Sequence, residues 1–426
     1  MIDKNDILIL CKVVDNFGDI GVVYRLARAL SDLRPSLNLT LVVSNLESFH
    51  ALAPQIEPKK SLQDFRYKNS VWKIVDWNLG IGNEELGMRN EEGAVDTCEE
   101  IQNFALLTPH FSLILECFQC GRPDWLENLL FSPDFTDEVQ ILQIDYLTAE
   151  DYAEEFHLLK SGTRKTNIKK RFFMPGFTEK TGGLIFNEKL AVSNEKLENS
   201  RMDAGKSKER KFCLPLGEQN FLVGLKNTRK YFSILFFAYE DDCSAVVQAI
   251  SDFQEKMRET DADFSVCVYL ASGKSSVPFE NAWKKGNFSF KVEKIPFLPQ
   301  EEFDFFILTM DFLFVRGEDS LARACLSSLP FVWQAYKQDE NYQLVKVSAL
   351  LERMKAFFTE EEFAPIQAFW QSYNDYENQT ESEPLAKMLL DSANHKNTDG
   401  FKKFAAQLFK NGNLAVHLLE FIDSLS

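Results

Sequence analysis

Short apolar runs alternate with amphipathic segments along the first part of the chain. The run at residues 7–14 predicts a buried strand, and residues 22–30 place their apolar side chains on one face of a helix. Further strands are expected at residues 39–43, 71–77, 113–115 and 139–147. Strands separated by helices are typical of a doubly wound parallel sheet, with functional residues at the carboxyl ends of the strands.

The alternation of apolar runs and amphipathic segments resumes after a segment of different composition. Residues 186–212 are rich in Asn, Glu, Lys, Ser and Arg, which is typical of a junction between domains. Beyond it the pattern predicts strands at 231–239, 264–270, 288–295, 312–315 and 331–333, helices at 245–257 and 301–308, and a largely helical remainder after residue 341. We therefore expect an α/β protein with a first domain over 1–185, a second over 186–399, and terminal helices at about 400–426 (400–408 and 414–425) that pack back onto the first domain.

Three segments interrupt these patterns. Residues 57–69 and the acidic stretch 83–100 are interpreted as solvated insertions. The aromatic segment 172–177 contains Pro and Gly, which favours a rigid loop over a regular element.

Acidic residues follow the first predicted strand. Asp15 and Asp19 lie in a turn with Gly18 and Gly21, just before the helix. A carboxylate repels phosphate, so this turn is predicted to handle a nucleophile while another turn binds the anion. The alternative is that the glycines only form a turn and Asp19 only caps the helix. Two more acids, Glu116 and Asp145, are expected at or just after the ends of their strands, on the same edge of the sheet.

The second candidate site follows the strand at 312–315. Gly317 permits a sharp turn, and Asp319 or Ser320 is expected to cap the next helix. The N–H groups of its first turn would attract a diphosphate by roughly 0.3–2 kcal/mol, with Arg316 or Arg323 adding charge-assisted hydrogen bonds. Plain capping of an ordinary helix is the alternative.

Net charge and cysteine content limit the classes of function that the chain could have. The 426 residues carry a net charge of −17, which argues against nucleic acid as a partner because phosphate binding needs clustered Lys and Arg. The eight cysteines include a C-x-x-C at Cys117 and Cys120, for which buried thiols and a redox pair both remain open. No metal-ligand spacing, signal peptide or membrane-spanning run is recognised, so we expect a cytoplasmic protein without a metal.

Acids in the first domain and an anion-binding helix in the second fit the GT-B glycosyltransferase architecture, with two Rossmann-like domains facing a cleft. Five segments also closely resemble the protein-arginine rhamnosyltransferases that modify translation elongation factor P (EarP). They are CKVVDNFGDIGVVYRLAR (11–28), FMPGFTEKTGGL (173–184), KIPFLPQEEFD (294–304), VRGEDSLARA (315–324) and PFVWQAYKQDEN (330–341), and they occur in the family's order.

The resemblance implies an inverting, metal-independent enzyme that acts on elongation factor P, with dTDP-β-L-rhamnose as donor. We expect the enzyme to be a monomer. It implies that Asp19 is the general base, with Asp15 as its neighbouring acid, and that Glu318 is a second essential carboxylate. Donor-binding positions implied by the same motifs are Phe237, Tyr239, Phe297, Gln300, Arg316, Asp319 and Ser320. The chain departs from the family pattern at Ala238, Gln334, Lys337 and Asp145.

Other functions remain as alternatives at this stage. A GT-B enzyme with a glycan or lipid acceptor, a catalytically silent partner of a translation factor and a nucleotide-sugar epimerase share much of the same sequence pattern. They differ in whether elongation factor P gains a deoxyhexose and whether the donor is consumed.

Overall fold

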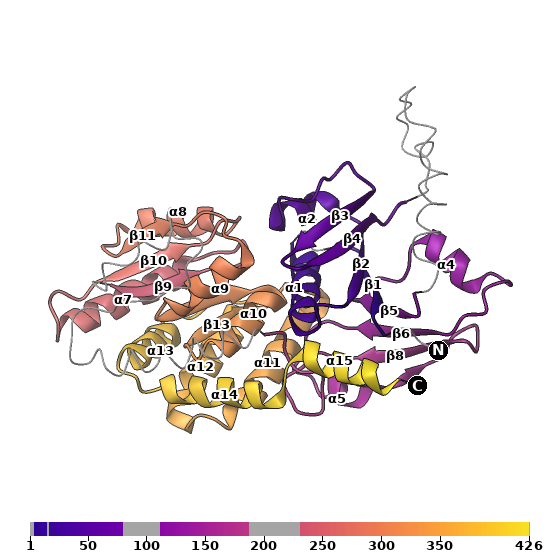
Figure 1. Ribbon diagram of the computed structural model, residues 1–426. Coiled ribbons are helices and arrows are strands. Elements are labelled where there is room, and N and C mark those ends of the chain that lie inside the picture. The colour runs from indigo at the N-terminus through magenta and orange to yellow at the C-terminus, as the bar shows by residue number, and fades with distance from the viewer. Residues whose placement is uncertain (1–3, 15–16, 80–110, 187–230, 426) are drawn as a thin grey trace. The chain divides into compact units, whose positions relative to one another are not determined.

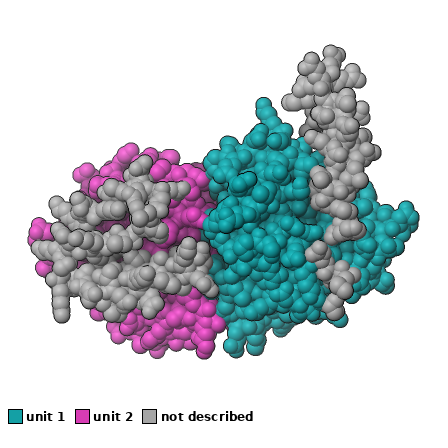
Figure 2. Space-filling view, viewed as in Figure 1, with its two compact units in different colours: residues 1–186, 411–426 teal, residues 187–410 magenta. Residues whose placement is uncertain are grey.

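The computed structural model describes residues 4–14, 17–79, 111–186 and 231–425. These residues form two compact units, one of residues 1–186 with 411–426 and one of residues 187–410 (Figure 2). The interpreted insertion at 83–100 and the interpreted junction at 186–212 lie outside the described residues, apart from Phe186.

The first unit is built on an eight-stranded sheet with the order β3-β4-β2-β1-β5-β6-β8-β7 (Figure 1). Its central pairs are parallel, and β3 and β7 join the two edges antiparallel. Its described elements are β1 (Asp6–Cys11), α1 (Gly18–Leu33), β2 (Asn38–Val43), α2 (Leu46–Leu52), β3 (Leu62–Tyr67), β4 (Ser70–Asp76), β5 (Leu113–Cys117), α4 (Asp124–Phe131), β6 (Val139–Ile144), α5 (Tyr152–Phe156), β7 (Lys160–Ser161), β8 (Ile168–Phe173) and α15 (Leu414–Ser424).

Alternate residues of the central strands pack into two hydrophobic cores, one on each face of the sheet. Ile7, Ile9 and Leu115 pack with α1 and α15 on one face of the sheet, while Leu8 and Ile114 pack with α4 on the other. A strand covered on both faces must be apolar at nearly every position, which is why these strands appear as continuous apolar runs.

Two predictions about the first unit are wrong, and one predicted helix is confirmed with an earlier start. Residues 57–69 are not a solvated insertion, because β3 pairs with β4 and buries Gln63 and Phe65 from one face. Phe172 and Phe173 end β8 and do not begin a loop, since β8 pairs with β6. The first helix begins at Gly18, four residues before the apolar pattern that predicted it.

The second unit has a five-stranded parallel sheet with the order β11-β10-β9-β12-β13. Its described elements are β9 (Phe232–Phe236), α7 (Ser244–Arg258), β10 (Val266–Leu270), α8 (Ser276–Gly286), β11 (Lys291–Lys294), α9 (Gln300–Leu308), β12 (Phe312–Arg316), α10 (Gly317–Leu326), β13 (Phe331–Gln334), the 3-10 helix η3 (Asp339–Asn341), α11 (Tyr342–Lys355), α12 (Glu360–Tyr373), α13 (Glu383–Ala393) and α14 (Thr398–Asn411). Its core is rich in aromatic contacts, as where Phe314 meets Phe369 of α12.

The chain returns to the first unit later than predicted. The helix expected at 400–408 is α14, which packs in the second unit through Phe401 against Phe331 and Phe358. Only α15 joins the first unit (Figure 1), where the N–H of Leu414 donates to the carbonyl of Leu184 at 2.9 Å. Gly183 has a φ of +79° there, and a Cβ on it would collide with the carbonyl of Gly412, so the glycine of this motif is needed for the return of the chain.

Candidate active site

Asp19 lies in the first turn of α1, at the carboxyl edge of the first sheet. The residue before the helix is Phe17, and no side chain caps the helix there, so the alternative that Asp19 is an N-cap is wrong. Its Oδ2 instead accepts a hydrogen bond from the N–H of Val14 at 2.7 Å, and the residue is 4% exposed. The carboxylate is thus held by the strand-to-helix turn. Asp15, its predicted neighbour, lies outside the described residues.

Two further loops reach the same edge, because β5 and β6 follow β1 in the sheet. Asp145 comes directly after β6, as predicted, and accepts hydrogen bonds from the Nε2 of Gln119 at 3.0 and 3.3 Å. It also accepts one from the N–H of Tyr146 at 2.8 Å. The hydroxyl of Tyr146 lies 3.5 Å from the Oδ1 of Asp19, so the loops after β1 and β6 meet at this carboxylate, and Gln119 joins the loop after β5 to that after β6.

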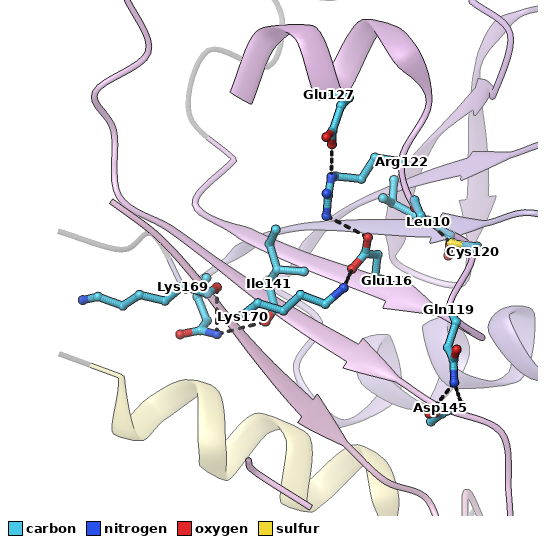
Figure 3. Close-up of polar contacts among 12 residues, drawn as sticks. Leu10, Glu116, Gln119, Cys120, Arg122, Glu127, Ile141, Asp145, Lys169 and Lys170 are labelled. Atoms are coloured by element: carbon cyan, nitrogen blue, oxygen red, sulfur yellow. Dashed lines mark hydrogen bonds and ion pairs between the residues drawn. The ribbon is translucent and has the colours of Figure 1, made fainter. Parts of the chain in front are cut away.

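Glu116 does not belong to this edge, which corrects its prediction. It lies inside β5 and is only 1% exposed. Its carboxylate is paired with the Nη1 of Arg122 at 2.8 Å and the Nζ of Lys170 at 2.6 Å, and Arg122 also donates to Glu127 (Figure 3). A buried carboxylate between two cations is a structural ion pair, and it fixes the loop after β5.

The C-x-x-C pair begins at the last residue of β5 and ends in that loop. Cys117 and Cys120 are free thiols, and burial raises the pKa of both, that of Cys120 to about 12. Because the thiolate is the reactive form, both cysteines are protonated, unreactive thiols at neutral pH, Cys117 fully buried and Cys120 partly buried.

The carboxyl edge of the second sheet carries a cation between aromatic rings. Arg316, the last residue of β12, places its guanidinium 4.6 Å from the ring centre of Phe237 and 4.7 Å from that of Tyr239. Both rings follow β9, the strand beside β12. Tyr239 also meets Tyr336 edge to face, with the ring centres 5.4 Å apart. The structure therefore brings together Arg316, Phe237 and Tyr239 from the predicted donor set.

The first turn of α10 holds the predicted second carboxylate, Glu318, and two more donor-site candidates, Asp319 and Ser320. This helix begins at Gly317, whose φ is +65°, so Glu318, Asp319 and Ser320 are already helical. The predicted cap at Asp319 or Ser320 is therefore wrong, because Arg316 is the N-cap and no side chain caps the helix. The tight turn that Gly317 makes possible places the start of the helix four residues before Leu321, where the apolar pattern predicts it.

The two remaining candidates follow β11. Phe297 is about half exposed, and Gln300 is the first residue of α9. In the sheet, β10 separates β11 from β9, and Phe237 meets Phe303 of α9 edge to face, with the ring centres 5.7 Å apart. The enclosure of a base by Phe297 and Phe237 stays a prediction.

Three buried amide side chains, those of Gln334, Asn374 and Gln343, hold the loops at this edge of the sheet. The sequence analysis did not identify this cluster. The Oε1 of Gln334 accepts the N–H of Tyr239 at 2.6 Å, and the Oδ1 of Asn374 accepts that of Ala335 at 2.7 Å. Gln343 holds the next turn by accepting the N–H of Gln338. A neutral amide gives no sequence signal of its own, because its partners lie up to 95 residues away. Gln334 also shows that this departure from the family pattern has a structural role.

Two parallel-sheet units, with a carboxylate at one edge and a cation between rings at the other, define a glycosyltransferase of the GT-B class. Among the described residues, no set of three or more His, Cys, Asp or Glu side chains is arranged as metal ligands, and no helix could cross a membrane. The chain belongs to the family of Elongation-Factor P (EF-P) rhamnosyltransferases, EarP, which matches residues 7–423.

Individual relatives agree with this family. The chain is similar to a protein-arginine rhamnosyltransferase of Shewanella oneidensis, at 26% identity over 97% of this chain and 96% of the relative. It is similar to one of Neisseria meningitidis at 29% identity, over 83% and 80% of the two chains. The fold is also that of a solved structure described as the basis of EarP-mediated arginine glycosylation of EF-P, with a TM-score of 0.54, 18% identity and 99% of both chains covered.

Proposed function

We propose that this enzyme transfers L-rhamnose from dTDP-β-L-rhamnose to one arginine side chain of elongation factor P, with inversion at the sugar carbon. The family match over residues 7–423 is the observation that carries the proposal. Because elongation factor P is a translation factor, the reaction belongs in the cytoplasm. The monomeric enzyme would work without a metal ion.

The acceptor poses the main chemical difficulty. A guanidinium has a pKa of about 12.5–13.8, so freeing a neutral guanidine at pH 7 costs roughly 7.5–9 kcal/mol. A carboxylate is too weak a base to remove this proton in an earlier, separate step. We therefore assign to Asp19 the proton that leaves as the new N–C bond forms, together with the alignment of the attacking nitrogen.

The hydrogen bond from Val14 supports this role. A carboxylate that is buried and fixed by a backbone N–H presents its other oxygen in a constant direction. Such alignment raises the reaction rate because the reacting atoms are already held in the geometry that the reaction requires. The second predicted acid, Asp15, would hold further N–H groups of the guanidinium.

The donor would bind at the carboxyl edge of the second sheet. As the N–C bond forms, the bond between the sugar carbon and the diphosphate oxygen breaks, and dTDP leaves with the electron pair. Arg316 and the N–H groups that begin α10, around Asp319 and Ser320, would bear that charge. Glu318 would bind sugar or ribose hydroxyls or stabilise the positive charge that grows on the ring, and Tyr239, Phe237, Phe297 and Gln300 would surround the base.

The test is direct. Purified enzyme is incubated with dTDP-β-L-rhamnose and unmodified elongation factor P, and the product is mapped by peptide mass spectrometry. We expect one deoxyhexose on one arginine, and none when that arginine is replaced by lysine. Donor consumption without an adduct would indicate an epimerase or a different acceptor, and donor binding without turnover would indicate a silent binding protein.

A further inference from the structure

Tyr146 has an unusual position for a large aromatic residue. It follows β6 at the carboxyl edge of the first sheet, and it is 37% exposed. Its ring stacks on that of Phe118, with ring centres 4.8 Å apart and planes 24° from parallel, while Phe118 itself is 8% exposed. Its hydroxyl lies 3.5 Å from the Oδ1 of Asp19. An aromatic ring is thus fixed beside the carboxylate without being buried in the core.

The loop beneath Tyr146 is held in a conformation that costs free energy. Phe118 and Gln119 have φ values of +59° and +53°, in the left-handed region where the side chain of a non-glycine residue is crowded by the backbone. The N–H of Phe118 donates to the carbonyl of Ile144 at 2.7 Å. Backbone strain of this kind persists only where the surroundings enforce it, and it is concentrated at functional sites.

Hydrogen bonds and ion pairs on both sides of the loop enforce it (Figure 3). On one side the amide of Gln119 donates to both oxygens of Asp145, the residue before Tyr146. On the other side Arg122 is paired with the buried Glu116 and with Glu127. The stacked rings are therefore supported by the sheet through contacts on the loops after β5 and β6.

A ring and a carboxylate in this arrangement suit a flat cation. A guanidinium stacks on an aromatic face and donates N–H bonds in its own plane, whereas an ammonium is a compact charge without a stacking plane. A guanidinium lying on Tyr146 would direct N–H groups toward the carboxylate of Asp19. Core packing does not explain the arrangement, since more than a third of Tyr146 is exposed.

We propose that Tyr146, stacked on Phe118, is the surface on which the acceptor's guanidinium lies while its nitrogen faces Asp19. The inference rests on the proposed function and adds an acceptor-binding residue to it. It also supplies a reason why an arginine acceptor would be preferred over a lysine.

Steady-state kinetics with varied elongation factor P and saturating donor test the role of the ring. Tyr146→Leu should raise the KM for elongation factor P about tenfold, the size of a lost cation–π contact at a partly desolvated site. Tyr146→Phe keeps the ring and should leave that KM within about twofold of the wild type. The KM for the donor should stay unchanged in both variants. Tyr152→Leu is the matched control, because Tyr152 is a similarly exposed tyrosine of α5 that packs on Phe156.

An unchanged KM for elongation factor P in Tyr146→Leu would overturn the inference. So would an equal rise in Tyr146→Phe, which would place the effect in the hydroxyl. Thermal melting of each variant separates a loss of fold from a loss of binding.

A binding experiment keeps the inference testable if the proposed acceptor is wrong. N-acetyl-arginine amide is titrated into wild-type enzyme with labelled tyrosine rings, and the Tyr146 resonance is assigned by its loss in Tyr146→Leu. We expect arginine amide to shift this resonance and N-acetyl-lysine amide to leave it in place. No shift with arginine would overturn the role of Tyr146, whether or not elongation factor P is the acceptor.

Discussion

The two sheets of this enzyme share parallel strands and covering helices but bury different kinds of polar group. The first sheet encloses a charged carboxylate, Glu116, between Arg122 and Lys170. The second encloses neutral amides, Gln334 and Asn374, that accept backbone N–H groups. In each case the buried polar group fixes a loop that follows a strand, so the common architecture leaves the chemistry at the carboxyl edge free to differ.

The edges differ in sign as well. The first presents the carboxylate of Asp19 with Tyr146, and the second presents Arg316 between Phe237 and Tyr239. A negative edge suits a cationic nucleophile, and a positive edge suits a leaving diphosphate. This comparison indicates that the two halves of the proposed reaction depend on different residues and can be impaired separately.

The largest expected effect is on turnover at the first edge. Asp19→Asn should lower kcat by about 10²–10⁴-fold, the usual contribution of a positioned general base, and leave the KM for the donor unchanged. Single-turnover modification of elongation factor P, followed by mass spectrometry, measures it. Asp32→Asn is the control on the same helix, because Asp32 pairs with Lys68 at the surface. Turnover equal to wild type would remove Asp19 from the mechanism.

The next effect is on stability and tests the charged interior of the first sheet. Glu116→Gln should cost about 3–5 kcal/mol in the free energy of unfolding, because it leaves Arg122 and Lys170 without their buried partner. Urea denaturation measures the change. The surface pair of Glu138 with Lys169 provides the control, since Glu138→Gln should cost about 0–1 kcal/mol. Equal effects in the two variants would contradict the difference drawn between interior and surface pairs.

A smaller effect is expected at the second edge. Arg316→Gln should raise the KM for dTDP-β-L-rhamnose about 10–100-fold, which corresponds to a lost charge-assisted hydrogen bond. Arg316→Lys should lie between this variant and the wild type, because it keeps the charge without the flat group that stacks on the rings. Donor titration by calorimetry checks both, with Lys284→Gln on α8 as an exposed control. If the KM for elongation factor P rose instead, the assignment of the two edges would be wrong.

The smallest effect concerns pH and the first unit. Burial, and to a lesser extent the neighbouring His417, lower the pKa of His157 to about 4 from an ordinary 6.5. The unfolded chain therefore takes up this proton at higher pH than the folded one. The contribution of neutral His157 to stability is full above about pH 6.5 and is lost as the pH falls toward 4.

Melting temperatures between pH 7.5 and 4 measure this loss. His157→Gln retains an acceptor for the N–H of Met174, which the Nδ1 of His157 accepts at 3.2 Å. The variant should show a shallower decline than the wild type across this window, and parallel declines would contradict the role of His157. His395, an exposed residue of the second unit, provides the control through His395→Gln.

The sequence alone determined the order of strands and helices. A strand buried on both faces must be apolar along its length, and a helix that covers a sheet must place apolar side chains on one face, with a period of 3.6 residues. The sequence also pointed to Asp19 and Arg316 by their place after such strands. Its resemblance to a family supplied the acceptor and donor, which no periodicity could give.

Only the tertiary structure decided which polar residues meet. Glu116 looked like an edge acid until Lys170, 54 positions later in the chain, proved to be its partner inside the sheet. The sequence analysis did not predict β3, because an edge strand that buries only one face lacks a continuous apolar run. The stack of Tyr146 on Phe118 depends on a left-handed backbone at Phe118 and Gln119, which is imposed by distant contacts and leaves no trace in the residue types themselves.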